Sequence, residues 1–346
     1  MTSNKGQLSA IQYLRALAAL MVVAHHARNP SPWLHNPWEG YSALERGVDV
    51  FFVISGFIMY HVARTEPPAE FFKKRLMRVV PLYWFATFGL VLLATRLRPW
   101  SIDPALVPHI LKSLVFIPAA HPNHPTELWP YLIPGWTLNY EMFFYLVFGL
   151  GLAISKPLAT VTVVMLGLVT AGLMTTDPGT ALRFGSNPII LEFLLGAWIA
   201  RLHAAGRAPR FAGTLLLVGL VGLLASPLID VPSAQMIARI VFSGMTVLGA
   251  TSLTFKVPQI RVLHLLGDAS YSIYLTHTFI ALTIAERIWM RAPLTGPLQF
   301  AGWMVCALVT SAVVGVLTYQ LFEKPTLAWL RSQLLHTANA KPNRAR

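Results

Sequence analysis

The sequence has very few charged side chains. Asp, Glu, Lys and Arg make up 12% of its 346 residues, whereas hydrophobic residues make up 55%. Soluble domains carry roughly one quarter charged residues, so this composition excludes an ordinary soluble enzyme. Long apolar runs recur along the whole chain instead. We therefore expect an all-α, polytopic integral membrane protein, with the lipid bilayer as a partner.

Acidic residues are the scarcer of the two charge types. The chain has 14 Asp and Glu against 27 Lys and Arg, a formal net charge of +13 at pH 7. In a soluble protein this excess would suggest a nucleic-acid partner. Here the basic residues fall in particular loops between the apolar runs, as membrane orientation requires. We expect no nucleic-acid partner.

Thiols are almost absent. The single cysteine, Cys306, excludes an intramolecular disulfide and leaves a thiol-based site without partners. His121 and His124 stand among prolines in AAHPNHP, a pattern that favours a plain loop over a metal site. We expect no metal ion and no tightly bound cofactor.

Ten segments are candidates for bilayer-spanning helices, which need about 20 apolar residues with a range of roughly 17 to 25. By residue number they are 8–27, 47–64, 79–96, 136–155, 158–174, 188–203, 212–228, 235–255, 270–289 and 298–321. The connection 97–135 is rich in proline and contains the apolar stretch ALVPHILKSLVFI. We expect that stretch to lie on the membrane or to re-enter it partly.

Positive charges concentrate in alternate loops, which predicts cytoplasmic positions for both termini. Arg287 and Arg291, after the ninth segment, are exceptions on the opposite side. We expect one transmembrane domain over residues 1–330 and a basic cytoplasmic tail over 331–346. The loop residues are Lys73, Lys74, Arg75 and Arg78 after the second segment, Lys156 after the fourth, Arg201, Arg207 and Arg210 after the sixth, Lys256 and Arg261 after the eighth, and Lys324, Arg331, Lys341, Arg344 and Arg346 near the end.

The first apolar segment contains an arginine and two histidines in LRALAALMVVAHH, although a charge at bilayer depth costs at least a few kcal/mol. Arg15 and His26 are eleven residues apart, so they share one helix face about 16 Å apart along the axis, while His25 points away. Arg15 is expected near mid-membrane and His26 near the outer end. His26 can act as a general base on an alcohol. The alternative is that both histidines are interfacial and Arg15 is a buried structural charge.

Three acidic residues have predicted depths in the outer half, close to His26. Asp49, in GVDVFFVISGF, either caps the second segment or orients and charges His26. Glu141, in PGWTLNYEMFFY, has no lysine nearby and needs a partner. Glu192, in LEFLLG, has a similar depth, although helix packing around Gly196 explains that motif almost as well.

Two further groups complete the set of candidate site residues. Arg75 and Arg78, in KKRLMRVVP, are neighbours on a helical turn and can together hold phosphate groups, unless they serve membrane topology alone. In LGDASYSIYLTH, Ser270, Tyr274 and His277 form a polar stripe at spacings of four and three, with His277 near mid-depth.

Together these residues resemble the membrane acyltransferase 3 family, especially its bacterial exopolysaccharide and lipopolysaccharide O-acetyltransferases. YLRALAALMVVAHH matches the family's signature of an arginine, ten residues and a histidine through Arg15 and His26. GVDVFFVISGFIM, RLMRVVP, PGWTLNYEMFFY and LGDASYSIYLTH match later blocks in the same order, and YQLFEKP resembles a closing Glu-x-Pro. The likeness extends over almost the whole chain.

The resemblance implies a multi-pass enzyme of the bacterial cytoplasmic (inner) membrane. It implies transfer of an acyl group, commonly acetyl, from cytoplasmic acyl-CoA as co-substrate to a carbohydrate hydroxyl. The acceptor would be a polysaccharide or a lipid-linked glycan. The competing interpretation is a transporter or flippase of a lipid-linked sugar or acyl donor, because intramembrane charges also mark substrate pathways.

The resemblance also implies roles for the polar residues. His26 would be the general base, with Asp49 or Glu141 tuning it, and Arg15 would neutralise developing charge or position a polar donor group. The acyl-CoA-binding residues would be Arg75, Arg78, Tyr274 and His277. A transient acyl-histidine is the mechanistic alternative.

Overall fold

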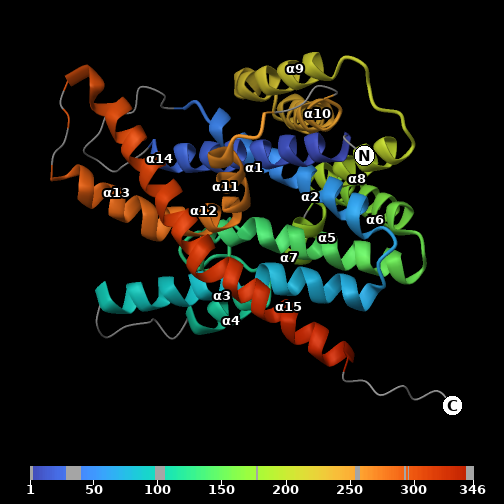
Figure 1. Cartoon of the computed structure of the whole chain (residues 1–346), viewed down its shortest axis with the longest axis horizontal. Coiled ribbons are helices and arrows are strands. Elements are labelled where there is room, and N and C mark those ends of the chain that lie inside the picture. The colour runs from blue at the N-terminus through green and yellow to red at the C-terminus, as the bar shows by residue number, and fades with distance from the viewer. Residues whose placement is uncertain are drawn as a thin grey trace.

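The computed structural model describes residues 3–28, 40–97, 106–176, 178–253, 258–291, 294 and 296–339. Every named element in these ranges is a helix, which confirms the all-α fold class (Figure 1). The longer helices are α1 (Ser3–Ala27), α2 (Gly47–Ala63), α3 (Pro68–Leu97), α5 (Trp136–Ala153), α6 (Pro157–Leu173), α8 (Ile190–Ala204), α9 (Ala212–Ala225), α10 (Pro232–Thr251), α14 (Gln299–Thr318) and α15 (Lys324–Asn339).

All ten predicted apolar segments form helical structure, and four of the helical stretches described are long and apolar enough to cross a membrane. These are Ala43–Ala63, Pro68–Thr95, Pro232–Thr251 and Gln299–Gln333, and Pro157–Leu173 and Ala212–Leu228 are shorter apolar helices. Ten crossings and cytoplasmic termini therefore stay predictions. Lys256, Lys341, Arg344 and Arg346 of the charge pattern lie outside the described residues.

The structure adds helices where the sequence predicted connections. The apolar stretch of the long connection forms α4 (Leu106–Leu114), which packs on α3: Tyr83 donates a hydrogen bond to the Ser113 carbonyl at 3.1 Å. Short helices α7 (Thr180–Gly185) and α11 (Arg261–Asp268) precede α8 and α12 (Ser270–Thr276). Helix α15 continues through residue 331, where the basic tail was expected to begin, and residues 340–346 of that tail lie outside the described residues.

Two long helices each contain one π-helical turn. The first, η4 (His277–Ala281), joins α12 to α13 (Leu282–Trp289), and the second, η6 (Tyr319–Glu323), joins α14 to α15. A π turn is rare and often occurs at functional sites, because it shifts the register of the side chains that follow. Each of these turns contains a buried polar residue, His277 in η4 and Glu323 in η6.

Helices α2 and α8 pack with their backbones in close contact. A Cβ built on Gly56 of α2 would overlap the Phe193 carbonyl, and one built on Gly196 of α8 would overlap the Val53 carbonyl. Small residues of this kind let membrane helices approach each other. The helix-packing interpretation of the LEFLLG motif is therefore confirmed at Gly196.

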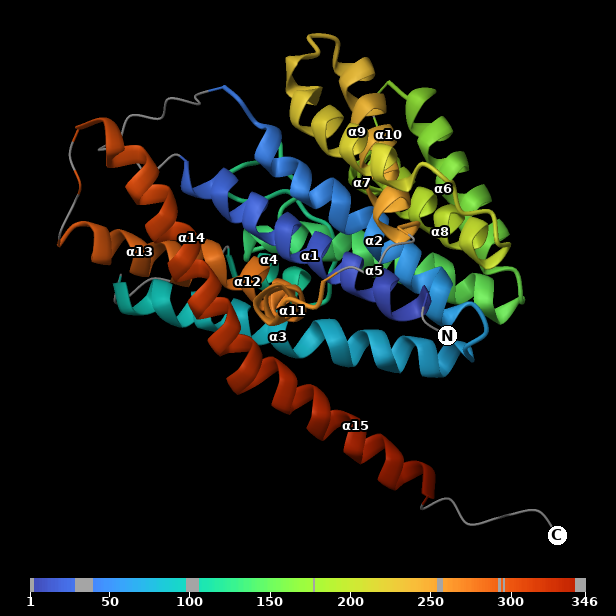
Figure 2. The same ribbon diagram turned by 45° about the horizontal axis from the view of Figure 1, so that its top comes forward.

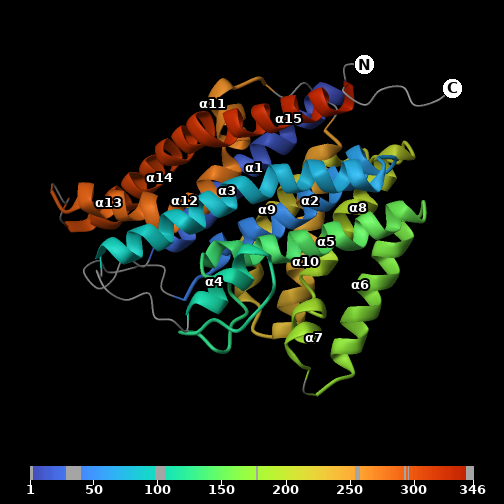
Figure 3. The ribbon, with the colours of Figure 1, turned by 90° about the horizontal axis from the view of Figure 1, so that it is seen from below.

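The helices form a bundle in which α1 and α2 occupy the middle. Figure 1 shows the α9–α10 pair on one side of them and α3 and α5 on the other. In Figure 2 both termini lie at the end of the bundle that also carries the α2–α3 and α5–α6 connections. Figure 3 shows α6 at the margin, beside α5 and α8. This arrangement leaves a cavity between α1, α2, α3, α5 and α12.

Candidate active site

The cavity has a volume of about 830 Å³, within the range of roughly 300 to 1,000 Å³ that is typical of ligand pockets. At one end it is lined by Glu66, Glu70 and Lys74, close to the α2–α3 connection. At the other end it reaches Thr137 and Tyr274. Its five basic residues are Arg15, Lys74, Arg75, Arg78 and Arg331, and its acidic residues are Glu66, Glu70, Glu141 and Asp268.

Arg75 and Arg78 both line the cavity from α3, as their spacing of three predicted. The Arg75 guanidinium lies over the Phe71 ring at 5.6 Å, and its Nε is buried without a hydrogen-bond partner in the described part of the chain. Arg78 Nη1 lies 2.7 Å from Glu323 Oε1. Arg75 is therefore the arginine of the pair that can offer its full charge to an anionic ligand.

Glu323 anchors Arg78 and belongs to the site, although the sequence-based assignment of site residues left it out. The carboxylate is 4% exposed, and Ser272 donates a hydrogen bond to Oε2 at 2.6 Å. Burial of a carboxylate requires this kind of pairing, because an isolated buried charge is expensive. The sequence signal that could have identified Glu323 is its position in the largely apolar stretch YQLFEKP.

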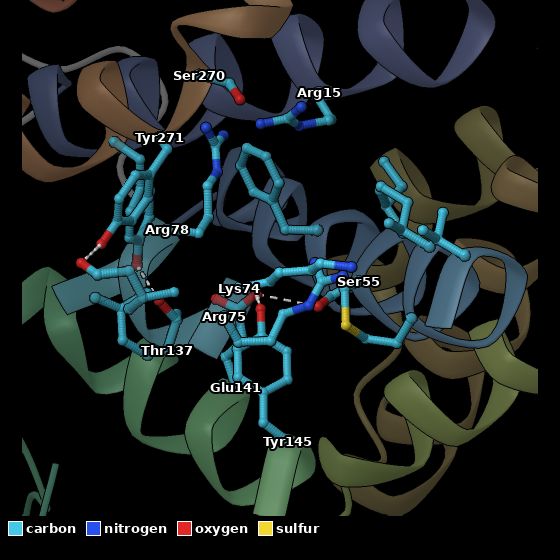
Figure 4. A pocket seen from close by; sticks show the side chains of 18 of the residues that line it. Arg15, Ser55, Lys74, Arg75, Arg78, Thr137, Glu141, Tyr145, Ser270 and Tyr271 are labelled. Atoms are coloured by element: carbon cyan, nitrogen blue, oxygen red, sulfur yellow. Dashed lines mark hydrogen bonds between the residues drawn. The ribbon is translucent and has the colours of Figure 1, made fainter. Parts of the chain in front are cut away.

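Arg15 reaches the same cavity from α1. Its Nη1 donates a hydrogen bond to Gln12 Oε1 at 3.1 Å, and Gln12 Nε2 in turn donates to Asp268 Oδ1 at 2.8 Å. Figure 4 shows Arg15 and Arg78 extending toward one another across the cavity, with Arg75 near Ser55, Glu141 and Tyr145. The three arginines thus surround one space from two helices.

Glu141 also lines the cavity, and its partners are two hydroxyl groups. Ser55 donates a hydrogen bond to Glu141 Oε1 at 3.1 Å, and Tyr145 donates to the same oxygen. These contacts supply the partner that the sequence required. They also put the carboxylate beside Arg75 at the middle of the cavity rather than beside His26 (Figure 4).

Asp49 does not contact His26 either. It is fully buried and forms an ion pair with Arg239 of α10, whose Nη2 lies 2.7 Å from Asp49 Oδ1. Arg239 Nε adds longer hydrogen bonds to both carboxylate oxygens, at 3.2 and 3.3 Å. The sequence predicted that Asp49 or Glu141 tunes His26, whereas tertiary packing gives both carboxylates other contact partners.

Hydrogen bonds hold Tyr274 at the end of the cavity that lies away from the α2–α3 connection. The Tyr274 hydroxyl donates to the Pro134 carbonyl at 2.8 Å and accepts from Thr137 Oγ1 at 3.0 Å. The backbone carbonyl of Tyr274 accepts a hydrogen bond from His277 Nδ1 at 2.6 Å. The side chain of Tyr274 therefore lines the cavity, and its backbone carbonyl binds His277.

His277 contacts His26, although the sequence predicted His277 among the acyl-CoA-binding residues. His277 Nε2 lies 3.2 Å from His26 Nδ1, and the ring centroids are 4.9 Å apart. His26 is solvent-exposed, His277 is fully buried, and neither is part of the cavity wall. The structure thus places His277 beside His26, directly beyond the cavity end, whereas the sequence predicted it among the donor-binding residues.

The hydrogen bonds assign the protons of this histidine pair. A carbonyl only accepts, so His277 Nδ1 must carry the proton that binds Tyr274, which leaves a lone pair on Nε2 of the neutral ring. His26 Nδ1 lies 2.9 Å from the Val22 carbonyl and must also be protonated, so it donates to Val22 and to His277 Nε2. His26 Nε2 then has the free lone pair that a general base needs.

Comparison with known proteins identifies the family of the chain. Residues 8–320 match the family described as the acyltransferase domain. The chain belongs to this acyltransferase family. The exopolysaccharide production protein ExoZ of Rhizobium meliloti (strain 1021) is 37% identical over 303 residues, which cover 81% of this chain and 89% of ExoZ. The acyltransferase MdmB of Streptomyces mycarofaciens is 25% identical over 370 residues, which cover 94% and 92% of the two chains. No solved structure matches.

Family membership makes the chain an acyltransferase, and its apolar helices make it a membrane protein. The matched residues 8–320 include His26 and His277. They also include the three cavity arginines of α1 and α3, which are Arg15, Arg75 and Arg78. Glu323 and Arg331 lie just beyond this range. The transporter interpretation has no comparable support.

Proposed function

We propose that this acyltransferase moves an acyl group, acetyl in the simplest case, from cytoplasmic acyl-CoA to a hydroxyl of a cell-surface or lipid-linked carbohydrate at the bacterial inner membrane. One observation carries the proposal. A cavity lined by basic side chains ends at Tyr274, and the backbone of Tyr274 holds His277, which in turn holds the base His26. The proposed donor site and the proposed base thus lie on opposite sides of Tyr274.

The phosphates of acyl-CoA would bind beside Arg75 and Arg331, because Lys74 is paired with Glu66 and Glu70 at 2.9 and 3.2 Å. Coenzyme A is polyanionic, and arginine forms planar paired hydrogen bonds to phosphate oxygens. Arg78 is less available because Glu323 occupies it at 2.7 Å. The thin pantetheine arm would extend past Arg15 toward Tyr274, which brings the thioester to the end of the cavity beside the histidine pair.

The spacing of Arg15 and His26 limits the role of Arg15. Eleven residues on one helix separate them by about 16 Å, so Arg15 cannot stabilise charge on a carbonyl that His26 serves. Its contact with Gln12 and its position on the cavity wall instead suit a residue that positions a polar group of the donor arm.

In the chemical step, His26 Nε2 would take the proton from the acceptor hydroxyl as its oxygen attacks the thioester carbonyl carbon. The carbon–sulfur bond then breaks, and the imidazolium returns the proton to the departing sulfur, giving an ester and free CoA thiol. His277 Nε2 accepts from His26 Nδ1, which stabilises the imidazolium that forms between the two proton transfers.

The acceptor would approach from the exposed side of His26. A carbohydrate acceptor is supported by the relative ExoZ, whose name assigns it to exopolysaccharide production. MdmB is named only as an acyltransferase. A hydroxyl on a large glycan needs this kind of open access, because the polymer itself cannot enter a closed cavity.

The test is acyl transfer by the purified full chain in detergent. Acetyl-CoA and a de-O-acetylated exopolysaccharide are supplied as substrates. Release of free thiol is followed with a chromogenic reagent, and the mass of the glycan is measured by mass spectrometry. We expect thiol release that requires the glycan, together with an added acetyl mass on it. Succinyl-CoA in place of acetyl-CoA tests donor choice. Thiol release without any gain of mass by the glycan would contradict a carbohydrate acceptor.

A further inference from the structure

A second cavity lies outside the active site, at the same end of the bundle as the termini. Its volume is about 600 Å³, and it is formed by the end of α2, the α5–α6 connection, the start of α6 and the end of α8. Trp198 Nε1 of α8 donates a hydrogen bond to Thr162 Oγ1 of α6 at 3.2 Å, which fixes the two helices on either side of it. No residue of the active-site cavity lines it.

The charge of this second cavity is uncompensated. Arg64, Lys156 and Arg201 line it, and no acidic residue does. None of the three forms an ion pair within the described ranges, and Arg64 stacks on the Tyr60 ring at 5.9 Å. The active-site cavity differs, because four acidic residues accompany its five basic ones. Three cationic side chains without ion-pair partners around one cavity favour an anionic ligand.

The wall of the second cavity continues into apolar surface along α6. Ala159, Thr162 and Val163 line it, and Leu166 follows on the same helix face at the next i+3 position. The exposed fractions of Val163 and Leu166 are 71% and 48%, and that of Trp198 is 43%. In a membrane protein these side chains meet hydrocarbon, and a tryptophan between apolar and basic surface is typical of the membrane interface.

From this combination we propose that the second cavity binds an anionic phospholipid of the surrounding leaflet. The headgroup phosphate occupies the space between Arg64, Lys156 and Arg201, and an acyl chain follows Val163 and Leu166 along α6. Basic pockets between transmembrane helices recognise such headgroups. A soluble anion such as free CoA would leave the apolar stripe and Trp198 uncovered, so the lipid satisfies both parts of the site.

The first test uses the unmodified full chain in detergent and native mass spectrometry. Cardiolipin, phosphatidylglycerol and phosphatidylcholine are titrated separately, with inorganic phosphate and free CoA as soluble competitors. We expect the two anionic lipids to bind at least about tenfold more tightly than phosphatidylcholine, since each basic residue near an anionic lipid contributes roughly fivefold. Equal affinity for the three lipids would overturn the proposal, as would displacement of cardiolipin by phosphate or CoA.

The second test locates the site with a matched pair of variants. Arg64→Gln/Arg201→Gln removes two charges from the cavity, whereas Arg207→Gln/Arg210→Gln removes two exposed charges of the α8–α9 connection that do not line it. We expect about 25-fold weaker cardiolipin binding for the first pair and less than about twofold change for the second. Equal losses in both pairs would show unspecific attraction and refute the site.

The single variants Arg201→Gln and Val163→Glu keep this test decisive if the double variant does not fold. Arg201→Gln removes one charge, and Val163→Glu puts a carboxylate on the exposed stripe that the lipid chain follows. We expect each to weaken cardiolipin binding by at least about fivefold. Unchanged binding in both folded variants would overturn the proposed site.

Discussion

His277 Nε2 accepts a hydrogen bond from His26 Nδ1 at 3.2 Å across 251 positions of sequence. The contact fixes the orientation of the exposed imidazole and leaves Nε2 of His26 as its basic atom. It also joins the first helix to the π turn that begins at His277. Because the Tyr274 side chain lines the cavity and its backbone binds His277, this contact links the cavity to His26.

Replacing His26 should nearly abolish acyl transfer. General-base catalysis contributes about 10²- to 10⁴-fold, so His26→Ala should lower kcat by that amount while the protein still inserts in the membrane. His25→Ala is the matched control, because His25 Nε2 lies 3.9 Å from Glu45 and takes no part in the pair. Acceptor-dependent thiol release measures both variants. Equal losses in the two would remove His26 from its assigned role.

Replacing His277 should weaken the base without affecting donor binding. His277→Leu removes one of the two acceptors of His26 Nδ1–H and leaves the Val22 carbonyl, and loss of one hydrogen bond of this kind corresponds to about tenfold in rate. His277→Gln keeps an acceptor oxygen and should recover part of kcat. We expect the KM for acyl-CoA to stay unchanged in both variants. An increase in that KM alone would return His277 to the donor site.

Arg75 should matter for donor affinity more than its exposed neighbour does. Arg75 lines the cavity with a buried, unpaired Nε, whereas Lys73 is exposed and is not part of the wall. We expect Arg75→Gln to weaken acyl-CoA binding by about tenfold or more, because a charge-assisted hydrogen bond contributes roughly 1.5 to 3 kcal/mol. Lys73→Gln removes the same charge from the same helix. Calorimetry that gives equal affinities for the two variants would assign Arg75 to membrane topology alone.

Asp49 should be important for stability rather than for chemistry. Asp49 is fully buried and pairs with Arg239, whose side chain is 28% exposed, so removing the carboxylate charge costs up to roughly 3 to 5 kcal/mol, the value for a fully buried pair. Asp49→Asn should therefore lower the thermal midpoint in detergent, while the remaining folded protein keeps its pH profile. The exposed residue Asp230 supplies the control Asp230→Asn. A shifted pH profile in Asp49→Asn, with an unchanged midpoint, would restore the catalytic interpretation.

Activity should fall in acid, because the imidazolium form of His26 cannot take a proton from the acceptor hydroxyl. Stability also depends on pH in the connection between α3 and α5, where burial lowers the pKa of His109 and His121. These two rings favour the folded state while neutral, so their contribution is lost as pH falls below the ordinary histidine value. Initial rates and thermal midpoints measured across one pH series separate the two effects. A rate that stays constant down to pH 5 in folded protein would exclude a histidine base.

Most of the helical architecture could be read from the sequence, because apolar length and helical periodicity are local properties. The ten predicted segments are helices, and the face shared by Arg75 and Arg78 lies on the cavity as their spacing indicated. The α-helical periodicity no longer predicts the direction of side chains where the α-helix changes to a π turn. Tyr274 and His277 were predicted on one stripe, but only the Tyr274 side chain lines the cavity, and His277 begins a π turn and contacts His26.

The sequence by itself determined the class of protein and which polar residues require an explanation. Arg15, His26, Asp49 and Glu141 stand in apolar segments, and a charge or polar group there must find a partner whatever the fold. Only the tertiary structure decided the partners, because Asp49 meets Arg239 and His26 meets His277 across most of the chain. Depth along a helix can be counted from the sequence, whereas the direction in which neighbouring helices face each other is set by close packing such as that at Gly56 and Gly196.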